Sequence, residues 1–97
     1  MSTVIVIGSG VAGLASALRF SIKGYKVHVF ESNNYVGGKI AEIKGNGFRF
    51  DAGPSLFTMP ELIDDLIRLS DNNPQNYFQY SRLKESCRYF FDDKTII

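Results

Sequence analysis

The sequence lacks tryptophan and has only one cysteine and three prolines among its 97 residues. A single cysteine excludes both an internal disulfide and a multi-cysteine metal site, so we expect no bound metal. The low cysteine content fits a reducing compartment. We expect Cys87 to be a buried, apolar residue. No run reaches the roughly 18 apolar residues of a membrane-spanning helix. The apolar run from Val4 to Leu18 has no preceding Lys or Arg, which argues against a secretory signal. We therefore expect a cytoplasmic protein, or one attached to a membrane at one face.

An excess of charge of one sign is also absent. Eleven Lys and Arg residues balance ten Asp and Glu residues, which leaves a net charge of +1. Such a chain has no field strong enough to attract nucleic acid or an anionic membrane, so we expect no nucleic-acid partner. The length allows one small domain, which would bury roughly 60 to 70% of the surface that its unfolded chain exposes.

The first 31 residues predict a strand, a helix and a second strand. The β-branched run Val4–Ile7 is typical of a strand buried on both faces of a parallel sheet. Apolar residues recur at helical spacing over residues 11–23, and Gly24 ends that pattern. Residues 27–30 then predict a second strand, with Glu31 at its carboxyl end. The fold class is α/β, built on a βαβ unit.

The connection between the first strand and the helix matches the pattern G-x-G-x-x-G. Its residues are Gly8, Ser9, Gly10, Val11, Ala12 and Gly13. The first glycine permits a tight turn, the second lets the backbone approach a pyrophosphate, and the third lets the helix pack closely on the strand. The phosphates would meet the unpaired N–H groups at the start of the helix.

Glu31 follows the glycine pattern at about the 20-residue distance at which a carboxylate accepts hydrogen bonds from ribose hydroxyls. A carboxylate at this position disfavours a 2′-phosphate and hence NADP. The sequence therefore predicts a Rossmann-like dinucleotide site. The alternative is that the glycines only shape a βα turn beside an ordinary solvated acid.

Turn and capping signals follow the βαβ unit. Residues 32–38 predict a loop, and Gly45-Asn46-Gly47 between two apolar segments, residues 40–44 and 48–50, predicts a β-hairpin. Thr58-Met59-Pro60-Glu61 has the pattern of a capping box with proline in the first turn. We therefore expect a second, amphipathic helix to begin there.

The last part of the chain has a different texture, because aromatic residues become frequent after the polar breaker Asp71–Pro74. Three segments predict strands: residues 77–83, 88–91 and 95–97. Residues 92–94 would be the turn between the last two. The change in composition predicts a domain boundary near Pro74, which divides the chain into residues 1–73 and 74–97.

Two further motifs are Val36-Gly37-Gly38-Lys39 and Phe50-Asp51-Ala52-Gly53-Pro54-Ser55. The first resembles the second glycine motif of the flavin-containing amine oxidase and phytoene desaturase superfamily. That family usually has arginine after the glycines, and Lys39 keeps the charge without the bidentate fork. The second motif most resembles the carotenoid branch, which contains phytoene desaturases, hydroxycarotenoid desaturases and carotenoid isomerases.

The resemblance implies FAD as the cofactor and an oxidoreductase that desaturates a lipophilic polyene by passing hydride to the flavin. It implies that Gly38 and Lys39 lie near the FAD phosphates and ribose, and that Gly53, Pro54 and Ser55 lie close to the flavin. No catalytic side chain is implied, because the flavin carries the chemistry. Residues 1–73 would be the amino-terminal part of the FAD-binding domain, and residues 74–97 the start of a β-rich substrate domain.

Several alternatives stay open. A carotenoid isomerase would share these motifs, and an amine oxidase or protoporphyrinogen oxidase would share the first glycine motif, although the segment 50–54 argues against the latter two. A non-catalytic NAD-binding module would leave Gly37-Gly38 and Gly53-Pro54 unexplained. A two-stranded parallel sheet exposes both edges, so we expect an inactive fragment whose sheet, flavin pocket and any peripheral membrane site are completed by other segments.

Overall fold

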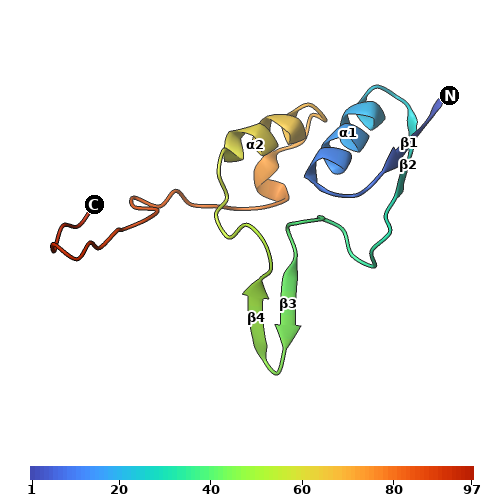
Figure 1. The fold of residues 1–97 in the computed structure, drawn as a ribbon. Coiled ribbons are helices and arrows are strands. Elements are labelled where there is room, and N and C mark those ends of the chain that lie inside the picture. The colour runs from blue at the N-terminus through green and yellow to red at the C-terminus, as the bar shows by residue number, and fades with distance from the viewer.

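The computed structural model describes residues 1–97 (Figure 1). Its elements in chain order are β1 (Thr3–Ile7), α1 (Val11–Ile22), β2 (Lys26–Phe30), β3 (Glu42–Gly45), β4 (Phe48–Asp51), α2 (Pro60–Arg68) and the 3₁₀ helix η1 (Pro74–Asn76). Neither α-helix has the length and apolar character that crossing a bilayer requires. The order of the elements confirms the α/β class and the initial βαβ unit.

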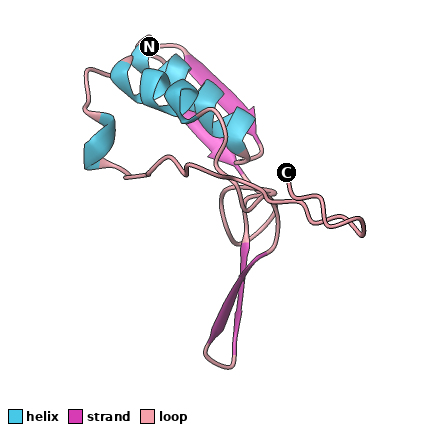
Figure 2. Cartoon of the chain, turned by 90° about the vertical axis from the view of Figure 1, so that its left-hand side faces the viewer, coloured by secondary structure: helices cyan, strands magenta, loops and turns pink.

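The βαβ unit pairs its two strands in parallel. The register places Thr3 opposite Lys26 and Ile7 opposite Phe30. The α1 helix lies against both strands, as Figures 1 and 2 show. Because side chains alternate along a strand, Val4 and Val6 face the helix and are half-buried.

The opposite face of this sheet is open. Ile5 is 63% exposed and Ile7 is 89% exposed. The expectation that the first strand is buried on both faces was therefore wrong for residues 1–97. The reason is that these residues supply a helix for one face only.

The predicted hairpin is confirmed. Strands β3 and β4 are antiparallel, with Gly45 opposite Phe48. Asn46 and Gly47 form the two-residue turn, and both have positive φ, 50° and 83°, as a type I′ turn requires. Figures 1 and 2 show the hairpin projecting away from the helices. One face of the hairpin carries ion-paired side chains: Glu42, Lys44, Arg49 and Asp51. The other face carries exposed apolar side chains: Ile43, Phe48 and Phe50.

The α2 helix begins at Pro60, which confirms the proline in the first turn. The predicted capping box was wrong. Met59, rather than Thr58, is the N-cap residue, it has a left-handed conformation with φ of 52°, and no side chain caps the helix. A capping box requires Glu61 at the third helical position. Because the helix starts one residue later than the box predicts, Glu61 occupies the second position instead.

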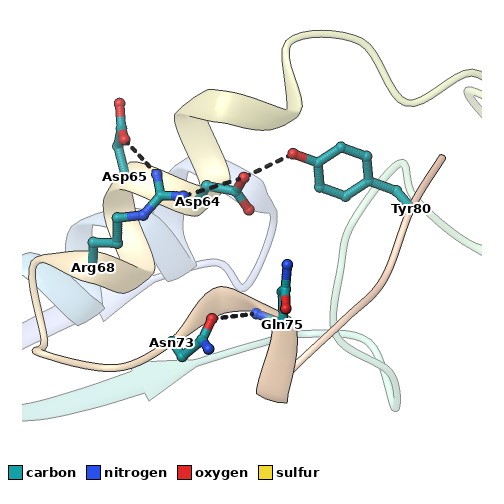
Figure 3. A network of polar contacts seen from close by, with 6 residues as sticks. All are labelled: Asp64, Asp65, Arg68, Asn73, Gln75 and Tyr80. Atoms are coloured by element: carbon teal, nitrogen blue, oxygen red, sulfur yellow. Dashed lines mark hydrogen bonds and ion pairs between the residues drawn. The ribbon is translucent and has the colours of Figure 1, made fainter. Parts of the chain in front are cut away.

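The segment after η1 folds back onto α2, and Figure 3 shows the polar contacts involved. The Tyr80 hydroxyl donates to the Asp64 carboxylate at 2.7 Å, and within α2 itself Arg68 pairs with Asp65 at 2.9 Å. The hydrogen bond to Asp64 raises the pKa of the Tyr80 phenol. The rings of Phe57 and Phe78 lie 5.7 Å apart, and each also contacts the Tyr80 ring. This aromatic and polar contact replaces the strand predicted over residues 77–83, which was wrong.

The end of the chain makes a minimal antiparallel pairing. Phe90 and Ile96 form a single bridge, and Tyr89 and Ile97 exchange backbone hydrogen bonds of 2.8 and 3.1 Å. The turn predicted at residues 92–94 is present, because the Lys94 N–H donates to the Phe91 carbonyl at 2.9 Å. The predicted strands are otherwise absent, since nothing in the structure extends this pair into a sheet.

Cys87 is exposed, so the expectation that it is buried was wrong. Burial throughout the chain is low: only Ser9, Leu66 and Pro74 are buried, and Leu66 is the one large apolar residue among them, at 9% exposed. The radius of gyration is 18.1 Å, against roughly 13 Å for a compact domain of about 100 residues. The elements are therefore held mainly by local pairs of contacts rather than by one common core.

Candidate dinucleotide-binding site

Two positions between the end of β1 and the first turn of α1 require glycine. Gly8 has φ of +96°, a conformation that strains other residues, and its N–H donates to the Phe30 carbonyl at 2.7 Å. A side chain at Gly13 would collide with the Gly8 carbonyl oxygen. The helix therefore starts as close to the strand end as the backbone permits, and this confirms the packing role predicted for the third glycine.

The amino terminus of α1 is left without a protein cap. Gly10 is the N-cap residue, it offers no side chain, and the first turn contains no acidic residue. The first bond of the helix runs from the Leu14 N–H to the Gly10 carbonyl at 2.9 Å. The N–H groups of the first helical turn, which precede Leu14, thus have no acceptor within the helix and can meet a negative charge. Space is open on the side of Gly10 where a Cβ would stand.

Glu31 follows β2 directly, and its carboxylate reaches back to the glycine loop. Its Oε2 accepts from the backbone N–H and the hydroxyl of Ser9, at 2.8 and 2.7 Å. Its Oε1 accepts from the N–H and side-chain amide of Asn33, at 2.9 and 3.0 Å, and from the Ser32 hydroxyl at 3.3 Å. Ser9 is 1% exposed. The strand-end acid and the glycine loop are therefore one connected structure.

The donors around Glu31 keep it ionised. The N–H of Asn33, followed by the N–H and hydroxyl of Ser9, lowers its pKa from 4.5 to about 2. An ionised carboxylate acts only as an acceptor. It can bind neutral hydroxyl donors and disfavours a second anion such as a phosphate.

The second glycine motif packs directly on the first. The Gly37 N–H donates to the Ser9 carbonyl at 2.9 Å, and Gly37 forms a parallel bridge with Gly10. A Cβ on Gly38 would lie 3.1 Å from the Gly10 Cα. Two motifs far apart in the sequence thus meet backbone to backbone, and a side chain at Gly38 would crowd the backbone of Gly10.

The remaining predicted site residues follow the second glycine motif in the chain. A side chain at Gly53 would overlap the carbonyl oxygen of Lys39, so these two segments are also in close backbone contact. Lys39 is exposed and forms no ion pair. Pro54 lines an open hollow of about 970 Å³ beside the hairpin, whereas Ser55 lines a separate one of about 460 Å³. The structure does not bring Ser55 and Pro54 into one cavity.

Sequence reasoning missed the contacts that Ser32 and Asn33 make with Glu31. A signal for them exists: Ser and Asn directly after a strand-end acid are residues whose side chains favour local turns. The structure brings together no group of three His, Cys, Asp or Glu side chains that could hold a metal ion.

Comparisons with known proteins agree with this geometry. Residues 6–69 match the family of NAD(P)-binding Rossmann-like domains. The chain is 53% identical, over 98% of its length, to a 1-hydroxycarotenoid 3,4-desaturase of Flavobacterium sp. (strain P99-3). It is 40% identical, over 97% of its length, to a 4,4′-diaponeurosporene oxygenase of Staphylococcus aureus (strain USA300). It spans 19% of the length of each of these relatives.

Similar chains are also found among solved structures. One of them is an oxidoreductase from Methanosarcina mazei, 40% identical, with a TM-score of 0.49 over 57% of this chain and 13% of that one.

Proposed function

Because the chain belongs to the family of NAD(P)-binding Rossmann-like domains, we propose that it binds FAD as the amino-terminal part of an oxidoreductase that desaturates carotenoids. The observation that carries this proposal is the contact between the two glycine motifs, from the Gly37 N–H to the Ser9 carbonyl. A nicotinamide-binding module has no need of the second motif, whereas the resemblance to flavin enzymes rests on it.

The proposed roles follow from the fit of each segment to part of FAD. The pyrophosphate meets the uncapped start of α1, where the open side of Gly10 leaves room for it. The Glu31 carboxylate accepts hydrogen bonds from the hydroxyls of the adenosine ribose. The complete proposed set is Gly8, Ser9, Gly10, Val11, Ala12, Gly13, Glu31, Gly38, Lys39, Gly53, Pro54 and Ser55.

The later members of this set serve the middle and the flavin end of the cofactor. Lys39, exposed and without an ion pair, supplies positive charge near the phosphates. Gly53 and Pro54 present bare and rigid backbone to a flat ring system. These segments bind and orient. When FAD is bound, it accepts the hydride that leaves the polyene.

The proposed substrate is a lipophilic polyene. The support is the 53% identity to a protein named for desaturation of hydroxycarotenoids, against 40% to one named as an oxygenase. Desaturation is therefore favoured over oxygenation and over isomerisation. We further propose that residues 1–73 belong to the FAD-binding domain and that residues 74–97 begin a substrate domain. A protein with such a substrate would work in the cytoplasm or at a membrane surface.

The test is the visible spectrum of the purified full-length protein, followed by anaerobic mixing with a hydroxylated carotenoid. We expect a flavin band that bleaches while the polyene absorption moves to longer wavelength. Bound flavin that does not bleach would contradict desaturation of that substrate. A protein that binds NAD and no flavin would contradict the cofactor.

A further inference from the structure

The Glu31 carboxylate is already surrounded by more donors than it can serve well. Five donors from Ser9, Ser32 and Asn33 lie between 2.7 and 3.3 Å from its two oxygens, and a carboxylate offers about four acceptor positions. A ribose brings two more hydroxyl donors. Some of the present hydrogen bonds must therefore be released before a ribose can be held.

The five donors differ in how easily they are released. Ser9 is 1% exposed, so its N–H and hydroxyl would have no water to bond if they lost Glu31, which makes their release costly. The N–H of Asn33 is fixed by the backbone. By contrast, the side chains of Ser32 and Asn33 are exposed and can turn towards water. The Ser32 bond, at 3.3 Å, is also the longest of the five.

We propose that Ser9 is a positioning residue that holds the Glu31 carboxylate in place for a ribose diol, and that the side chains of Ser32 and Asn33 occupy the place of the diol until it binds. This inference rests on the proposed dinucleotide site. In the unliganded site these side chains compete with the ribose, since the Ser32 hydroxyl and the Asn33 amide must leave Glu31 before the two ribose hydroxyls can donate to it. Ser9 contacts the same carboxylate as Ser32 and Asn33, and it is therefore expected to affect ribose binding in the opposite direction from those two side chains.

The experiment uses full-length protein from which flavin has been removed, and two probes: ADP and 2′,3′-dideoxyadenosine diphosphate. Binding is measured by titration calorimetry. Asn33→Ala should tighten ADP binding by about three- to tenfold, because a competing hydrogen bond to a charged group is gone. Asn33→Ala should leave the affinity for the dideoxy probe unchanged, because that probe has no ribose hydroxyls that compete with Asn33 for the Glu31 carboxylate. Ser32→Ala should act in the same direction but less, since its bond is longer.

Ser9→Ala should weaken ADP binding by about three- to tenfold, because the carboxylate loses a buried donor that orients it. It should scarcely change binding of the dideoxy probe, which a general disturbance of the glycine loop would weaken equally. Asn34→Ala is the matched control, because Asn34 is the next exposed asparagine and makes no hydrogen bond to Glu31.

The outcomes separate this inference from the proposed function. If wild-type protein binds neither probe, the dinucleotide site itself is wrong, and this inference falls with it. If wild type binds ADP but Asn33→Ala and Ser32→Ala bind it no tighter, the dinucleotide site stands and the competition is overturned. Equal weakening of both probes by Ser9→Ala would overturn the positioning role.

Discussion

The two ends of this chain contrast in what holds them. In residues 3–53, segments far apart in the sequence meet through backbone contacts, such as the Gly37 N–H on the Ser9 carbonyl. In residues 74–97 the regular secondary structure amounts to the short η1 helix and a single bridge, and Phe90 is 72% exposed. Both regions are rich in apolar residues. The difference shows that the close backbone contacts that glycine permits can form between a few segments. An apolar strand pattern, by contrast, forms a strand only when other strands are present to make a sheet.

The largest expected effect comes from filling the open space at the start of α1. Gly10→Val should abolish FAD binding, because the Cβ and its methyl groups would stand where a pyrophosphate approaches. The fold should survive, since nothing lies within 4 Å of a Cβ at this position and Gly10 has an ordinary φ of −68°. The measurement is flavin absorbance per protein, with circular dichroism to check folding.

A matched variant tests whether this effect is specific. Gly45→Val places the same side chain at another glycine with open space, in the hairpin. It should retain flavin. Flavin bound at the wild-type level by Gly10→Val would refute the assignment of the glycine loop to the phosphates.

The next largest effect is expected at the acid that joins the first region together. Glu31→Gln keeps the size of the side chain but replaces one acceptor oxygen with an NH2 group, which donates and cannot accept from Ser9 or from a ribose hydroxyl. FAD affinity should fall by about tenfold or more, because hydrogen bonds to a charged acceptor are the stronger ones. The dissociation constant of FAD, measured by fluorescence quenching, checks this. Glu42→Gln on the hairpin is the control, and equal losses in both variants would count against a specific role.

A pH dependence sharpens the same comparison. The pKa of Glu31 is lowered from 4.5 to about 2 by the donors of Asn33 and Ser9. A lowered folded value means that its contribution to stability is fully present above the unfolded pKa of 4.5 and is lost as pH falls towards 2. In the full-length protein with Glu labelled at the side-chain carboxyl, the NMR signal of Glu31 should titrate near the lower value. A midpoint near 4.5 would show that the hydrogen bonds around it do not persist in solution.

How much could be predicted from sequence follows the same division. The roles of Gly8 and Gly13 and the turn at Asn46-Gly47 were predictable, because each depends on backbone conformation or sterics that a few neighbouring residues define. The position of Glu31 at a strand end was predictable from the apolar pattern of residues 27–30 and from its distance to the glycine motif. The glycine loop therefore carries its structural information locally.

What could not be predicted depends on which side chains meet. The alternating aromatic residues around Tyr80 fit a strand. In the structure, however, the Tyr80 hydroxyl donates to Asp64 and the Tyr80 ring contacts Phe57. Nothing in the local pattern identifies those partners. The capping box failed for a different reason: the left-handed backbone conformation of Met59 shifts the start of α2 by one residue. The buried hydroxyl of Ser9 was named only as part of a motif, because its bond to Glu31 spans 22 residues of sequence.

The smallest effect is expected from breaking the contact that ties the second region to α2. Tyr80→Phe removes the hydroxyl that donates to Asp64 and keeps the ring against Phe57 and Phe78. Tyr80 is exposed and Asp64 is half-buried, so water can reach the hydroxyl and compete with this bond; the melting temperature should fall only slightly and flavin retention should not change. Tyr77→Phe is the control, because Tyr77 is exposed and its hydroxyl has no partner in the protein.

A larger loss of stability from Tyr80→Phe than from Glu31→Gln would reverse the contrast between the two regions. The ordering of residues 77–80 would then depend on one directed hydrogen bond rather than on ring contacts. The rings favour the opposite result, because three aromatic side chains with centroids 5.6 to 5.7 Å apart remain in contact without the hydroxyl. Replacing Phe78 with Ala should accordingly destabilise the segment more than Tyr80→Phe does, since it removes two of those ring contacts together.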